Sequence, residues 1–250
     1  MKYLDSVIKI KNDINDVDVH IYHLILSDFN EIKDNIEREI VDIWEADLGY
    51  DSESVKKDIY NTMCMKDDNK RHGMCAEFFM HLFLRSLGYK QKFLFSNLEE
   101  RSMKKGFDGL YEYVDEFWIA ESKCGIIETK HKDKIREALN DIDNKITNSS
   151  GNNPWKNALH HIMIRNNDKN ETLTKKVLKL SNDYINKIEH NSSEFNLIPT
   201  STLFINNNQS DDEIRNEIKD IISGRKIKSM IVLCINNDVY NAFIDSLRGN

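Results

Sequence analysis

The stretch Gly106–Lys123 reads GFDGLYEYVDEFWIAESK and contains the signals that decide the fold. A glycine-flanked acid, Asp108, precedes an apolar and aromatic run, and a second such run ends in Glu-Ser-Lys. Asp115-Glu116 between the runs is a short polar pair of the kind that forms tight hairpin turns. We therefore predict two antiparallel strands, at Phe107–Val114 and Phe117–Cys124.

The predicted hairpin brings three charged side chains together. Residues two apart on a strand share a face. If the turn lies at Asp115-Glu116, Leu110 falls opposite Glu121, and Asp108 falls opposite Lys123 on the same face. Two carboxylates can hold Mg²⁺, with Mn²⁺ as a substitute, and leave coordination sites for water and phosphate. Lys123 would then polarise the attacking water or stabilise charge on phosphorus.

Hydrophobic periodicity places further elements on both sides of this stretch. Upstream, we predict a strand at Val17–Leu26, helices at Phe29–Leu48, Ser54–Met65 and about Met74–Leu87, and a strand at Gln91–Ser96. Downstream, we predict helices at about 132–147, 154–165 and 172–189, strand Ile198–Ile205, helix Asp211–Ile222, strand Lys228–Ile235 and a closing helix from Asp238. This order predicts an α/β protein with a mixed central sheet flanked by helices.

Composition limits the class of protein. The 250 residues are 40% hydrophobic and 31% charged, and no apolar run approaches the roughly 18 residues that a membrane helix needs. The amino terminus lacks the apolar core of a signal peptide, and the four cysteines form no C-x-x-C pair, so we expect a cytoplasmic protein with reduced thiols and no membrane partner. The net charge of -7 opposes long-range attraction to DNA, which therefore requires a local basic patch or a partner.

One such patch follows the Glu-Ser-Lys strand. We call it the basic cluster: Lys130, His131, Lys132, Lys134 and Arg136. Charge runs of this kind are usually solvated surface. Beside a phosphodiester-cleaving site, however, Lys130 and Lys132 are suited to contact the DNA backbone without sequence preference.

The motifs together resemble the PD-(D/E)xK nuclease superfamily. An acid in a glycine turn is followed thirteen residues later by an apolar-apolar-Glu-x-Lys strand end, and a helix upstream carries Glu77. The resemblance implies a restriction-endonuclease-like core of helix, three-stranded meander, helix and strand from about residue 71. It implies that Asp108 and Glu121 are metal ligands, that Lys123 is the catalytic lysine, and that Glu77 makes a further, water-mediated metal contact. Gly-Phe-Asp-Gly replaces the usual Pro-Asp, and helices are inserted before the fourth strand.

Within that superfamily, the HGMCAEFF helix, GFDGLYEY and the ESK strand most resemble the HamA family of the bacterial Hachiman anti-phage system. This resemblance implies a metal-dependent DNA endonuclease effector controlled by a superfamily 2 helicase partner of the HamB type. Endonuclease effectors of cyclic-nucleotide defence systems share the core, but we expect no second domain of their kind in 250 residues. We expect an N-terminal region at 1–70 packed on a nuclease core at 71–250, with a helical insertion at about 154–189. Residues 1–70 and the insertion would form docking surface.

Several alternatives remain open at this point. The charged side chains on the two strands would also form a solvated cross-strand ion cluster, which stabilises a sheet little. Glu128-Thr-Lys130 is a second possible Glu-x-Lys motif, although it lies beyond the hairpin. Glu77, His81 and Arg85 recur every four residues and would equally form a solvent-facing stripe. At the level of function, the alternatives are an idle nuclease fold that binds DNA or assembles with a partner, and a stand-alone restriction endonuclease.

Overall fold

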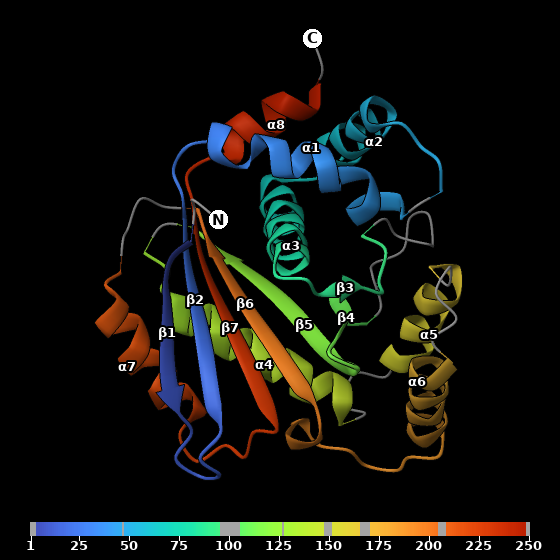
Figure 1. Cartoon of the computed structure of the whole chain (residues 1–250), viewed down its shortest axis with the longest axis vertical. Coiled ribbons are helices and arrows are strands. Elements are labelled where there is room, and N and C mark those ends of the chain that lie inside the picture. Colours follow the sequence, from blue (N-terminus) through green and yellow to red (C-terminus); the bar gives the residue numbers. More distant parts are fainter. Residues whose placement is uncertain are drawn as a thin grey trace.

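A single mixed sheet organises the molecule (Figure 1). The computed structural model describes residues 4–46, 48–95, 106–126, 128–147, 152–165, 171–204 and 209–248. In these ranges the strands are β1 (Leu4–Lys11), β2 (Asp18–Leu26), β3 (Lys90–Gln91), β4 (Gly109–Tyr113), β5 (Glu116–Gly125), β6 (Asn196–Leu203) and β7 (Ser229–Asn237). Their order is β1-β2-β7-β6-β5-β4-β3, with β2, β7, β6 and β5 parallel and both edges antiparallel. The predicted α/β class with a mixed sheet is confirmed.

Helices cover both faces of this sheet. The helices of the described residues are α1 (Asn30–Glu45), α2 (Ser52–Cys64), α3 (Asp68–Ser86), α4 (His131–Ile146), α5 (Pro154–Ile164), α6 (Glu171–Ile185), α7 (Asp211–Ile222) and α8 (Tyr240–Arg248), with a 3₁₀ turn at Ser192–Glu194. One hydrophobic core joins α1, α2, α3 and α8 to the first face, and a second core joins α4, α5, α6 and α7 to the other.

Alternation along β5 assigns each side chain to one of the two cores. Trp118 and Ala120 lie in the core beneath α3, whereas Phe117 and Ile119 lie in the core beneath α4. Because successive strand residues point to opposite faces, Glu121 belongs to the α4 side. Helix α4 packs on β5 and β6, so its inner surface determines the surroundings of that carboxylate.

Helix α3 begins earlier than its hydrophobic pattern predicts. The helix was predicted to begin at about Met74, but α3 starts at Asp68, and the Asp67 side chain caps it by accepting a hydrogen bond from the Lys70 N–H. An aspartate at this position satisfies a backbone donor that the first helical turn leaves unpaired. A polar run can therefore be helical when it carries its own cap.

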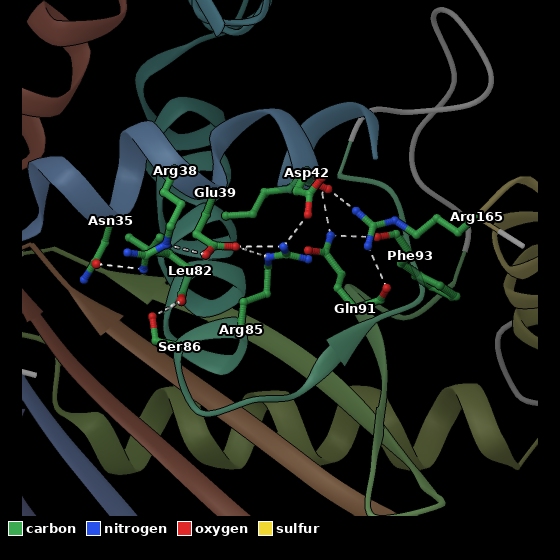
Figure 2. A network of polar contacts seen from close by, with 11 residues as sticks. Asn35, Arg38, Glu39, Asp42, Leu82, Arg85, Ser86, Gln91, Phe93 and Arg165 are labelled. Carbon is green, nitrogen blue, oxygen red and sulfur yellow. Dashed lines mark hydrogen bonds and ion pairs between the residues drawn. The ribbon is translucent and has the colours of Figure 1, made fainter. Parts of the chain in front are cut away.

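The stripe of Glu77, His81 and Arg85 does not face solvent. Figure 2 shows Arg85 reaching α1, where it bonds Glu39 at 2.8 Å and Asp42 at 2.6 Å. Arg165, at the end of α5, donates to the Gln91 carbonyl at 2.6 Å and to the Asp42 carbonyl. These contacts tie α1, α3, β3 and α5 together at the β3 edge. The solvent-face reading of Arg85 is therefore wrong.

The strand predicted at Gln91–Ser96 is reduced to β3. Residues 93–95 are buried, and the Phe95 N–H donates to the Ile43 carbonyl of α1 at 3.1 Å instead of to a neighbouring strand. An apolar run buried on all sides gives no alternation to hold a strand register. Ser96 lies outside the described residues.

The first segment of the chain builds part of the sheet. Strand β1, which was not predicted from the sequence, pairs with β2 at one edge of the sheet. Strand β2 runs parallel to the central strand β7. Residues 4–26 therefore contribute directly to the central sheet. Among the helices that the structure describes, none has the length and apolar character needed to span a membrane.

Candidate functional site

The β4–β5 hairpin turns one residue earlier than predicted. Val114 and Asp115 form the turn with φ of 48° and 57°, and Leu110 pairs with Ile119 rather than with Glu121. Two left-handed residues are typical of the tight turn that matches strand twist, but a β-branched residue rarely adopts that conformation. The predicted register is therefore wrong by two residues. An even shift leaves every side chain on its predicted face.

This register brings the two predicted carboxylates closer together. Continuing the ladder one step beyond the Gly109–Ala120 pair places Asp108 opposite Glu121, not opposite Lys123. Asp108 Oδ2 accepts a hydrogen bond from the Ser122 backbone N–H at 2.8 Å, which fixes it against β5. A Cβ at Gly109 would lie 2.7 Å from the Tyr111 ring, so the glycine after Asp108 permits this close packing.

Glu121 lies at the centre of a small ionic cluster beneath α4. Its side chain is only 2% exposed, and Lys145 Nζ lies 2.6 Å from each of its oxygens. Lys123 Nζ lies 3.3 Å from Oε1 and also pairs with Asp141. Lys145 and Asp141 were not predicted as site residues. Their spacing of four on the helix that follows the Glu-x-Lys strand was the available signal, because such residues share one helix face.

The electrostatics of the cluster favour an added cation. Burial and the charge of Asp108 raise the pKa of Glu121 to about 7, against the opposing effect of Lys145 and Lys123. Burial alone would lower the pKa of Lys123, but the charges of Glu121, Asp141 and Asp108 outweigh it and raise that pKa above its ordinary value. Two neighbouring carboxylates, one of them desolvated, gain from any positive charge placed between them. Their hard oxygen donors fit a divalent ion such as Mg²⁺.

Glu77 lies on a different side of the sheet from this cluster. It is carried by α3, and its carboxylate lies 3.6 Å from His81 Nε2, while His81 Nδ1 bonds the Tyr111 hydroxyl. The structure does not gather Glu77, Asp108 and Glu121 into one set of neighbouring ligand atoms. In the described ranges, the three-residue set whose potential ligand atoms all lie within 4.8 Å is Asp5, His23 and Asp211.

The histidine of that set belongs to a buried hydrogen-bond chain. His23 Nδ1 lies 3.0 Å from Asp211, and Asn236 Nδ2 lies 3.3 Å from His23 Nε2. Asn236 Oδ1 lies 3.0 Å from His131 Nε2, and His131 Nδ1 lies 2.9 Å from the Ser201 hydroxyl. Both ring nitrogens of each histidine have a hydrogen-bond partner, which gives this group a structural explanation. His131 is fully buried, so its inclusion in the basic cluster is wrong.

The rest of the basic cluster is paired with local acids. Lys130 and Lys132 lie 3.3 and 3.5 Å from Glu217 of α7, and both stay partly exposed. They stand at the first turn of α4, roughly 20 Å along the helix axis from Lys145. Glu128, the acid of the second Glu-x-Lys possibility, is exposed in the turn after β5. The hairpin motif, and not Glu128-Thr-Lys130, is therefore the one beside the buried cluster.

Fold and cluster together define an α/β protein whose central sheet carries a buried carboxylate between lysines, at the end of an antiparallel hairpin. The sequence model of the HamA family matches residues 1–248, so the chain belongs to the HamA family. This confirms the resemblance inferred from the GFDGLYEY and ESK motifs, and it extends over the N-terminal strands as well. Membership indicates a component of the Hachiman anti-phage defence system. No curated protein matches the sequence.

Proposed function

We propose that this chain is the metal-dependent DNA endonuclease effector of its defence system, with a PD-(D/E)xK type of active site. The observation that carries the proposal is the position of Asp108, Glu121 and Lys123. The ladder sets Asp108 beside Glu121, and Lys123 reaches the Glu121 carboxylate from the same face of β5. The order α3, β3, β4, β5, α4 and β6, with α5 and α6 inserted, agrees with the core of that superfamily.

Each residue would have a distinct task in hydrolysis. Asp108 and Glu121 would hold Mg²⁺, and a bound divalent ion lowers the pKa of water and neutralises phosphate charge. Lys123 would stabilise the negative charge that develops on the phosphate, and Asp141 keeps its ammonium oriented. The resemblance assigns Glu77 a water-mediated metal contact from α3, where its carboxylate pairs with His81.

Recognition and control would come from a second protein. The body of the chain carries a net charge of -7, so its own long-range attraction for DNA is weak. A nuclease of broad specificity also requires restraint in its own cell. Both needs support a superfamily 2 helicase of the HamB type as the partner, with Lys130 and Lys132 contacting the DNA backbone once it is delivered.

Plasmid nicking tests this proposal directly. The purified chain, with and without a helicase of the HamB type, should cleave in Mg²⁺ or Mn²⁺ and stop in EDTA. Glu121→Gln should not cleave with or without the helicase. Co-elution of the chain with the helicase should reveal their complex. Cleavage at one defined sequence by a chain that ignores the helicase would favour the stand-alone restriction enzyme instead.

The burial of Glu121 favours a second candidate, an idle nuclease fold that binds DNA or assembles with its partner. Its carboxylate is almost entirely covered, and both oxygens already contact a lysine. Such a protein would bind the helicase or DNA but neither bind a divalent ion through Glu121 nor cleave DNA. Calorimetric titration with Mn²⁺ separates the two candidates.

A further inference from the structure

Lys145 lies closer than Lys123 to the buried carboxylate of Glu121. Its ammonium lies 2.6 Å from Oε1 and 2.6 Å from Oε2 of Glu121, a two-oxygen contact from a single cation. Lys123, in contrast, reaches one oxygen at 3.3 Å and divides its charge with Asp141. Lys145 therefore stands where a cation shared by both oxygens would stand.

An ammonium and a divalent ion cannot both occupy that position. A magnesium ligand oxygen lies about 2.0–2.1 Å from the ion, and Lys145 lies 2.6 Å from each oxygen, so the ammonium would lie within about 5 Å of a double positive charge. At that separation, like charges repel strongly in a partly buried site. One of the two cations must leave the shared side of the Glu121 carboxylate.

Of the two lysines, Lys145 is the one able to move. Within the described residues its ion pair is with Glu121, whereas Lys123 keeps Asp141 as a second partner. Lys145 also lies in the last turn of α4. A cation released there remains favoured, because the carboxyl end of a helix attracts positive charge.

We propose that Lys145 is a positioning residue of the metal centre, which holds Glu121 in place and competes with the divalent ion for its two oxygens. This inference rests on the proposed function, since it requires Glu121 to be a metal ligand. Lys145 would thereby raise the metal concentration needed for loading. The unloaded site would remain ordered around a carboxylate that is almost wholly buried and paired with Lys145.

Metal binding in the absence of DNA tests the inference without reference to cleavage. Mn²⁺ titration followed by calorimetry would compare the wild-type chain with Lys145→Gln, Lys145→Arg and Glu121→Gln. Lys134→Gln is the matched control, because Lys134 lies on the same helix and pairs with Glu137. Lys145→Gln should tighten Mn²⁺ binding about tenfold to a hundredfold, the scale of one charge-assisted hydrogen bond. Lys145→Arg keeps the cation and should bind like the wild type, as should Lys134→Gln.

Side-chain NMR of the wild-type lysines provides a second readout that does not depend on how a variant folds. The Lys145 signal should shift as Mg²⁺ is added, and the Lys134 signal should not. Suppose that Glu121→Gln abolishes Mn²⁺ binding, as a metal ligand requires. If Lys145→Gln then binds Mn²⁺ no more tightly than the wild type, or if the Lys145 signal does not shift with Mg²⁺, the competition is refuted and the metal centre stands. If Glu121→Gln binds Mn²⁺ like the wild type, the proposed metal centre fails, and the inference fails with it.

Discussion

Asp108 Oδ2 accepts a hydrogen bond from the Ser122 backbone N–H at 2.8 Å, which joins the turn before β4 to the middle of β5. Asp108 lies outside the β4 ladder, yet this bond holds its carboxylate beside the residue that follows Glu121. An acid that cross-links two strands in this way is positioned by the backbone.

Asp108→Asn should therefore separate charge from structure. The amide oxygen can still accept from Ser122, but the loss of charge should lower cleavage by about 10²-fold or more while the melting temperature changes little. Plasmid nicking beside a thermal melt measures both. Glu116→Gln on the same hairpin, whose side chain is half exposed, is the control and should stay active. Wild-type cleavage by Asp108→Asn would remove this residue from the site.

Glu77→Gln should have a milder effect. Because Glu77 contacts His81 on the α3 side and would act through water, its loss should reduce cleavage about 10- to 100-fold, the usual effect of an outer ligand. Nicking rates at saturating and limiting Mg²⁺ measure this, and the deficit should be larger when Mg²⁺ is limiting. A loss as large as that of Asp108→Asn at saturating Mg²⁺ would contradict the water-mediated role.

Replacing Lys130 and Lys132 by glutamine should weaken DNA binding equally for all sequences. If both contact phosphates, the slope of log affinity against log salt should become less steep by about 2. Fluorescence anisotropy of the purified chain on DNA across a salt series gives this slope. Lys9 and Lys11, which are exposed on the edge strand β1, provide the matched double replacement and should leave it unchanged. An unaltered slope for both pairs would assign Lys130 and Lys132 to a purely structural pairing with Glu217.

Periodicity was sufficient to predict most of the elements, because the buried faces are regular. Helix α7 has its predicted bounds, whereas β6 begins two residues earlier and β7 ends two residues later than predicted. Helix α3 was predicted too short, since an aspartate cap outweighed an otherwise polar run. The short β3 differs because the Phe95 N–H bonds the Ile43 carbonyl near the end of α1, a tertiary contact that no local pattern reports.

The candidate site was predictable only along the strand. Glu121 and Lys123 share a face by simple alternation, and the error in the turn did not change that face. The partners from α4 could not be assigned in the same way. Whether Lys145 meets Glu121 depends on how far α4 runs back across β5, which is set by packing and not by sequence spacing.

His131 shows how a residue within a charged run can belong to the core. Both of its ring nitrogens are engaged, one with Asn236 and one with Ser201, and its side chain is fully buried. Burial, against the opposing hydrogen bond to Asn236, lowers the pKa of His131 from 6.5 to about 3. The imidazole therefore stays neutral in the folded protein at pH values where the unfolded chain is protonated.

This difference predicts a pH-dependent stability. The pKa of His131 is lower in the folded than in the unfolded chain, so the contribution of His131 to the free energy of unfolding is fully present above pH 6.5. This contribution is lost as the pH falls from about 6.5 towards 3, because over that range the unfolded chain binds a proton that the folded protein does not. By pH 4 the loss would approach roughly 3 kcal/mol. His131→Gln cannot titrate, so the stability advantage of the wild type over this variant should shrink by that amount between pH 7 and pH 4. Urea unfolding at several pH values measures the free energy of unfolding of both proteins. If the two plots of this free energy against pH are parallel, His131 is protonated in the folded protein as readily as in the unfolded chain.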